Sequence, residues 1–245
     1  GKIYRMLEKL TMAVWMILLC IGWHTIVWAD DRLPPAEREN PKATERIDLW
    51  YVSLRDRTER SSSEDFYGGL RGEMRAGTCT LEFTPIPGLK NIADAAPFYI
   101  PDERKELQHV EESTLDRFWE EIEAFVRNNS GKVVFYVHGY NVSFEKSCRR
   151  AAIFQRSLRP HHRLLLFSWP ADGNLLAYTR DEADLMWSVP RIASLLHGLN
   201  RRLGSGRLDV VGHSLGARGV VLALQGIACR HPSDPLVDEL VLVAP

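Results

Sequence analysis

The second half of the chain alternates short apolar runs with longer amphipathic segments. The apolar runs, as expected of strands covered on both faces, occupy residues 133–137, 164–167, 208–211 and 240–244. Apolar side chains at helical spacing predict helices over residues 115–128, 144–158, 179–203 and 215–228. Strands joined by helices form parallel sheets with right-handed crossovers. The sequence therefore predicts an α/β fold in which helices cover both faces of a mostly parallel central sheet.

The first half gives a weaker pattern. Residues 47–54 alternate apolar and polar side chains well enough for a strand. Residues 61–77 are rich in Ser, Gly and charge, which predicts a loop, and residues 80–83 predict a short strand ended by the prolines that follow. In the later helix over 179–203, Pro190 is expected to kink the helix or split it in two.

The N-terminal segment has the pattern of a targeting signal. Three basic residues precede an apolar stretch over residues 10–28, and Val27-Trp28-Ala29 has the small residues of a cleavage site. Residues 1–29 are therefore predicted to be a signal peptide, with an uncleaved membrane anchor or a buried helix as the alternatives. The first two place the rest of the chain outside the cytosol, as an exported periplasmic or extracellular protein or one anchored in the cell envelope through residues 10–28.

The remainder divides into a linker and one domain. Residues 30–45 are polar and proline-bearing and predict a linker. Residues 46–245 are assigned to one α/β domain, with N-terminal strands and loops over 46–110 and the core over 111–245.

Composition limits the partners. Thirty-one Lys and Arg residues balance 32 Asp and Glu residues in 245 residues, so no global basic field favours nucleic acid. Cleavage of the leader would leave three of the four cysteines, an odd number, so no full disulfide framework is expected. The expected partner is a small-molecule acyl ester, with neither cofactor nor metal, and the oligomeric state cannot be read from this pattern.

Ser214 is the candidate nucleophile. Residues 212–216 read Gly-His-Ser-Leu-Gly, the G-x-S-x-G pattern, and lie between a predicted strand and a predicted helix, which is the context that this pattern requires. Gly212 and Gly216 would let neighbouring chain pass close to the turn. The serine oxygen would then stand at a helix N-terminus, where the helix dipole favours negative charge. An ordinary glycine-rich turn is the alternative.

An oxyanion hole needs two N–H donors aimed at one point. One is expected from the backbone of Leu215. The other is expected from the loop that follows residues 133–137, with the Tyr140 N–H favoured over that of Gly139. His138, Gly139 and Asn141 would support this loop; Asn141 would pin it through its side chain or be an ordinary turn residue.

Three sequence blocks resemble those of a known superfamily. Residues 134–141 (VFYVHGYN), 165–173 (LLFSWPADG) and 210–218 (VVGHSLGAR) occur in this order with helix-sized spacings. Together they resemble the α/β-hydrolase superfamily, and most of all a poorly characterised bacterial group that is esterase/lipase-like. The resemblance covers about residues 47–245 and implies a Ser–His–acid triad and the hydrolysis of carboxyl esters or near relatives.

The base and the acid of that triad are not evident. Only His138 and His213 are predicted at the correct edge of the sheet; His213 should point away from the serine oxygen, and His138 belongs to the oxyanion loop. The superfamily order is Ser, acid, His, so both missing residues are expected beyond Pro245, and the chain reads as a fragment. An acyltransferase and a catalytically silent envelope-associated binding protein are the alternatives to an esterase.

Overall fold

A computed structural model describes residues 44–60, 62–86, 93, 103–172, 178–231 and 236–244. The chain divides into two units, Gly1–Lys42 and Ala43–Pro245, and the described residues all lie in the second. The predicted leader over residues 1–29 and nearly all of the predicted linker lie outside the described residues. Among the residues described, no helix has the length and apolar character needed to cross a bilayer.

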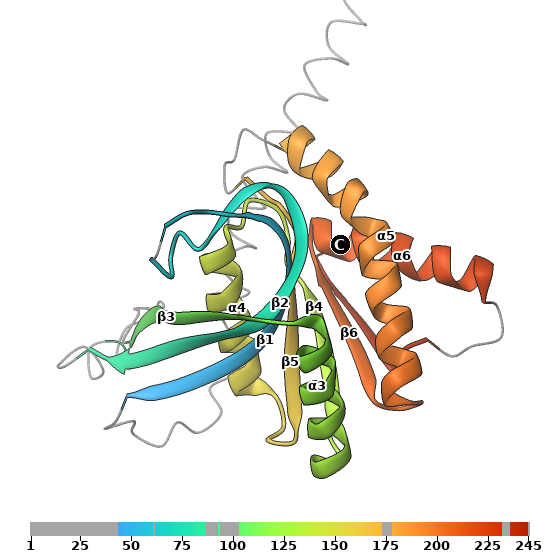
Figure 1. Cartoon of the computed structure of the whole chain (residues 1–245), viewed down its shortest axis with the longest axis horizontal. Helices are drawn as coiled ribbons and strands as arrows, with labels where there is room; N and C mark the ends of the chain where they lie inside the picture. Colours follow the sequence, from blue (N-terminus) through green and yellow to red (C-terminus); the bar gives the residue numbers. More distant parts are fainter. Residues whose placement is uncertain are drawn as a thin grey trace, which may run out of the picture. The chain divides into compact units, whose positions relative to one another are not determined.

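Seven strands form a single mixed sheet (Figure 1). Their order in the sheet is β3-β2-β1-β5-β4-β6-β7. The strands are β1 (Glu45–Arg57), β2 (Tyr67–Pro85), β3 (Glu103–Ser113), β4 (Lys132–Val137), β5 (His162–Ser168), β6 (Leu208–His213) and β7 (Glu239–Val243). The strand pairs β1–β5, β5–β4, β4–β6 and β6–β7 are parallel, whereas β2 runs antiparallel to both β1 and β3. The predicted mostly parallel sheet is confirmed.

Helices cover both faces of this sheet. The helix α4 (Phe144–Ser157) lies on one side, and α3 (Leu115–Asn129), α5 (Tyr178–Leu203) and α6 (Leu215–Arg230) lie on the other (Figure 1). Two buried apolar clusters correspond to the two faces. Alternate residues of β4 enter them in turn: Val133, Phe135 and Val137 join the cluster under α3, α5 and α6, while Val134 and Tyr136 join the one under α4. Burial on both faces explains why this strand reads as a continuous apolar run.

The predicted loop over residues 61–77 is wrong in its second half, because β2 begins at Tyr67 and runs for 19 residues. The glycines that suggested a loop mark places where backbones approach closely. A Cβ atom on Gly72 would lie 2.3 Å from the carbonyl oxygen of Arg55, and one on Gly77 would lie 1.9 Å from that of Glu111. The prediction of a short strand at 80–83 recovered only the end of this long strand.

Two further elements differ from expectation. The edge strand β3 was not predicted, because only Leu107 and Val110 of its residues are buried and its sequence carries no clear alternation. The helix α5 runs through Pro190 as one element, so of the two effects expected of this proline, a kink or a split, the split does not occur. In the core from β4 to β7, the predicted elements match the observed ones closely.

Candidate active site

Ser214 occupies a sharp turn between a strand and a helix. β6 ends at His213 and α6 begins at Leu215, and Ser214 between them has φ 51° and ψ −125°. A positive φ is uncommon for a residue with a side chain, and such strain concentrates at functional sites. The Ser214 side chain makes no capping hydrogen bond to α6 and is half-buried, while its backbone N–H donates to the carbonyl of Val243 at 2.8 Å. The hydroxyl is therefore not committed to capping the helix that it precedes.

Both glycines of the G-x-S-x-G pattern are required by close packing. A Cβ atom on Gly212 would lie 2.6 Å from the Cα of Ala217, which is in the first turn of α6. A Cβ atom on Gly216 would lie 2.3 Å from the carbonyl oxygen of His138. Such distances are shorter than any real contact, and the obstructing atoms belong to backbone. The first glycine thus lets α6 fold back on β6, and the second lets α6 approach the loop after β4.

The loop between β4 and α4 lies beside this turn. β4 pairs in parallel with β6, with Val137 opposite Gly212, so the chain leaves both strands at the same edge of the sheet. A Cβ atom on Gly139 would lie 3.0 Å from the Cβ of Ser214 and 2.7 Å from the Nδ1 of His213. The expectation that Gly139 permits a close approach to the nucleophile candidate therefore has a geometric basis. Tyr140 follows directly, and its ring contacts that of Tyr178 edge-on at 5.3 Å.

His138 is completely buried and held on all sides. Its ring stacks on Trp169 at 5.1 Å, and its carbonyl oxygen accepts a hydrogen bond from the Trp169 Nε1 at 2.8 Å. Its Nδ1 lies 2.9 Å from the Gly139 carbonyl oxygen, and its Nε2 lies 3.4 Å from a guanidinium nitrogen of Arg55. Burial, reinforced by the charge of Arg55, lowers the pKa of His138 well below its ordinary value. With both ring nitrogens occupied, His138 is a loop residue and is unsuited to act as a general base.

Asp181 ties two loops together at this edge. One carboxylate oxygen accepts the backbone N–H of Asn141 at 3.1 Å, and the other accepts that of Asp172 at 2.8 Å. Burial raises the pKa of Asp181, although these two donors oppose the shift. Asn141 itself has a left-handed φ of 57°, and its side-chain oxygen has no hydrogen-bond partner within the described part of the chain. Asn141 is therefore held through its backbone N–H, and its side-chain oxygen does not pin the loop, which fits the turn-residue alternative.

Sequence analysis missed Arg55 and Asp181 as parts of this site. Asp181 lies in the first turn of α5 and is fully buried, although a charged helix start is ordinarily solvated. Arg55 lies near the end of β1 and is 1% exposed. The one available signal was position: Arg55 lies near the carboxyl end of β1, and Asp181 lies in the first turn of α5. Both places are at the carboxyl edge of the sheet, where sites of α/β folds gather.

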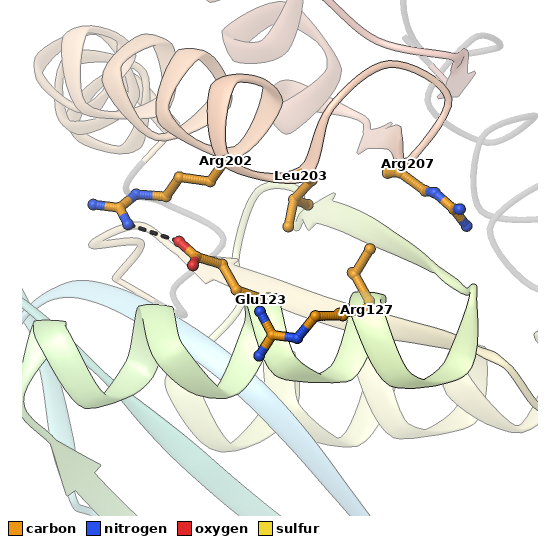
Figure 2. Close-up of a pocket in the computed structure, with 6 residues that line it drawn as sticks. Glu123, Arg127, Arg202, Leu203 and Arg207 are labelled. Carbon is orange, nitrogen blue, oxygen red and sulfur yellow. Dashed lines mark hydrogen bonds and ion pairs between the residues drawn. The ribbon is translucent and has the colours of Figure 1, made fainter.

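A cleft of about 250 Å³ lies elsewhere, between the ends of α3 and α5 (Figure 2). It is lined by Glu123, Val126, Arg127, Arg202, Leu203 and Arg207. Arg202 donates to the Glu123 carboxylate at 2.7 Å across it. Arg207 directly precedes β6, whereas Ser214 directly follows that strand, so the cleft lies at the opposite edge of the sheet from Ser214. None of its lining residues was a predicted site residue.

Comparison with known proteins gives three similarities. The uncharacterized protein alr1448 of Nostoc sp. (strain PCC 7120) is 24% identical over 110 residues, which cover 35% of this chain and 29% of that protein. The match thus spans less than a third of the length of that relative. A type II creatininase mutant of known structure aligns with 51% of this chain and 55% of its own at 15% identity, with a TM-score of 0.31, too low to support a comparison of folds. The third similarity is to a family model described as an alpha/beta hydrolase of unknown function, DUF900, which matches residues 115–245 and with them more than half of the chain. The chain belongs to this family of α/β hydrolases.

Proposed function

We propose that the chain is a serine hydrolase that cleaves small carboxyl esters through an acyl-enzyme on Ser214. The observation that carries the proposal is the conformation of Ser214: a residue with positive φ between β6 and α6, with an uncapped, half-buried side chain beside Gly139. This is the arrangement in which a strand-turn-helix motif presents a nucleophilic serine. Membership of a hydrolase family supports the same class of reaction.

The reaction would proceed in two steps. The Ser214 Oγ attacks the ester carbonyl carbon, the carbonyl oxygen becomes an oxyanion, and the alcohol leaves to give an acyl-serine. Water then attacks the acyl-serine and releases the carboxylic acid. The backbone N–H groups of Leu215 and Tyr140 would stabilise the oxyanion in both steps. Leu215 is the first residue of α6, where backbone N–H groups have no partner within the helix.

A general base must take the proton of Ser214 in the first step and return it to the leaving alcohol. His138 does not fit this task, because its Nδ1 and Nε2 face Gly139 and Arg55. The order Ser, acid, His of the superfamily puts both partners after the strand that follows the nucleophile helix, which here is β7. That the base and the acid come from chain beyond Pro245 stays a prediction, as does export through residues 1–29.

Labelling with a fluorophosphonate tests the proposal, because this reagent modifies serines that are activated for attack. The wild-type protein, expressed with the full reading frame in which the chain occurs, is expected to form one covalent adduct on Ser214. Ser214→Ala should abolish the adduct, and Ser205→Ala, which removes an exposed serine from the turn before β6, should leave it unchanged.

The rival functions give different results in the same assay. A catalytically silent binding protein would form no adduct, and that outcome would overturn the proposal. An acyltransferase would form the adduct but would divert the acyl group of an activated ester to an added alcohol or amine. Release of free acid at an unchanged rate in the presence of such acceptors supports the hydrolase.

A further inference from the structure

Arg55 is a completely buried arginine near the end of β1. It is 1% exposed, and arginines are seldom buried this far unless their donors are satisfied. It lies outside the residues that match the family model. Burial lowers its pKa to about 10, with the charge of Asp181 partly offsetting that cost. The guanidinium is nevertheless protonated at neutral pH, so a positive charge lies within the carboxyl edge of the sheet.

The guanidinium of Arg55 contacts three separate parts of the chain. Its Nε donates to the Ser168 hydroxyl at 2.8 Å, and one Nη donates to the carbonyls of Ala171 at 2.9 Å and Gly68 at 3.2 Å. The other Nη donates to the carbonyl of Val142 at 2.6 Å and faces the Nε2 of His138 at 3.4 Å. Two of these partners, His138 and Val142, flank the loop that carries Gly139 and Tyr140.

The contact with Arg55 decides which nitrogen of His138 carries the proton. A guanidinium only donates, so the facing Nε2 must be the acceptor. A neutral imidazole then carries its proton on Nδ1, and this N–H donates to the Gly139 carbonyl oxygen at 2.9 Å. Arg55 thus turns His138 into a fixed donor toward the oxyanion loop.

The Gly139 carbonyl and the Tyr140 N–H belong to one peptide unit. The described chain contains no cis peptide bond, and in a planar trans unit the C=O and N–H point in opposite directions. The hydrogen bond from His138 therefore fixes the direction of the Tyr140 N–H, away from the buried imidazole. Asp181 holds the next N–H, that of Asn141, and Arg55 holds the carbonyl of Val142.

We infer that Arg55 is a positioning residue that, through His138, sets the orientation of the Tyr140 N–H in the oxyanion hole. The role of this N–H as an oxyanion donor rests on the proposed function. Its orientation does not depend on any activity. A rotated Gly139–Tyr140 peptide would present a carbonyl oxygen where the oxyanion needs a donor. The oxyanion formed by attack of Ser214 would then keep only one of its two proposed N–H donors, that of Leu215.

The first test compares Arg55→Met with Arg46→Met, which makes the same change on the same strand at an exposed position. In protein labelled with ¹⁵N-tyrosine, Tyr140→Phe identifies the Tyr140 amide signal. Arg55→Met is expected to move that signal and Arg46→Met to leave it in place. The rate of fluorophosphonate labelling of Ser214 should fall about 10-fold or more in Arg55→Met, and it should be unchanged in Arg46→Met.

The second test keeps the question answerable if Arg55→Met fails to fold. His138→Asn places an amide N–H donor near the position of Nδ1, whereas His138→Leu keeps apolar packing against Trp169 without any donor. His138→Asn is expected to retain the Tyr140 amide signal and most of the labelling rate, and His138→Leu to lose both. Equal behaviour of the two variants would overturn the inference, since packing alone would then account for His138.

The amide signal separates this inference from the proposed function. If wild-type protein forms no adduct while Arg55→Met or His138→Leu still moves the Tyr140 signal, the orientation is established and the esterase proposal fails. If the wild type is labelled and these variants, folded, leave both the signal and the labelling rate unchanged, the inference fails and the esterase proposal stands.

Discussion

Gly139 lies so close to Ser214 that a Cβ atom on Gly139 would be 3.0 Å from the Cβ of Ser214. The loop after β4 and the turn after β6 are thus in contact through their backbones. Added volume at Gly139 should therefore disturb Ser214.

Gly139→Ala is expected to lower the rate of fluorophosphonate labelling of Ser214 by about 10-fold or more, because small displacements of catalytic groups have large effects on rate. The added methyl group would push the loop away from Ser214 and from the ring of His213. Gly198→Ala is the control, since a Cβ there would meet only the far edge of the Trp119 ring at 3.9 Å. Labelling of the control at the wild-type rate is expected; equal rates for both variants would contradict the prediction.

Two glycines of α6 should respond in opposite ways to alanine. Gly226→Ala is expected to raise the free energy of unfolding by about 0.5–1 kcal/mol, because alanine is the better helix former and a Cβ there meets only the end of Arg230 at 3.8 Å. Gly216→Ala should lower it by about 2 kcal/mol or more, because the new Cβ would lie 2.3 Å from the His138 carbonyl oxygen. Urea unfolding of the three proteins measures both changes, and a stabilising Gly216→Ala would refute the packing described here.

Asp181 gives a prediction about pH. Burial raises its pKa above the ordinary 3.8. The backbone N–H donors of Asp172 and Asn141 oppose this shift, the charge of the Asp172 carboxylate adds to it, and the charge of Arg55 opposes it. The folded protein therefore binds this proton more tightly than the unfolded chain, so the shift favours the folded state as the pH falls through the raised pKa. Relative to Asp181→Asn, which cannot take up the proton, the wild type should gain stability between neutral pH and the ordinary carboxyl pKa. Urea unfolding of both proteins at several pH values measures the difference, and a constant or shrinking difference on acidification would contradict the prediction.

The described cysteines should differ in reactivity. Cys229 is exposed on α6, whereas Cys79 and Cys148 are buried with no exposed surface. Burial also raises the pKa of the Cys148 thiol, which suppresses the reactive thiolate. Iodoacetamide should modify Cys229 in the native protein and the other two only after unfolding, as mapped by peptide mass spectrometry. Modification of Cys148 at the rate of Cys229 would show that the core under α4 opens readily.

The core of the fold could be predicted because its strands are buried on both faces. A strand such as β5, with Leu164 to Phe167 all inaccessible to solvent, leaves an uninterrupted apolar run that helices frame on either side. The strands β2 and β3 have no such uninterrupted apolar run in their sequences. One face of each is only partly buried, and the close approach of Gly72 and Gly77 to neighbouring backbone selects a residue that is otherwise typical of loops.

Sequence analysis could predict only those parts of the candidate site that are contiguous in the sequence or brought together by the pairing of neighbouring strands. Ser214 and its two glycines form a contiguous pattern, and the parallel pairing of β4 with β6 was sufficient to bring Gly139 beside them. Arg55 could not be found in this way, because nothing in a strand sequence distinguishes an arginine that faces solvent from one that reaches beneath a loop more than 80 residues away in the sequence. Asp181 could not be found either, because the N–H groups that it holds belong to Asn141 and Asp172, which lie in other loops.

The position of β1 has a practical consequence. The family match begins at Leu115, yet β1 lies between β5 and the antiparallel pair, in the interior of the sheet. A truncated protein that began at the family boundary would lack β1, and with it Arg55. The apolar strand β5 would then be an unpaired edge strand exposed to solvent. Such a fragment is expected to aggregate on expression, and recombinant work on this domain should start upstream of Glu45.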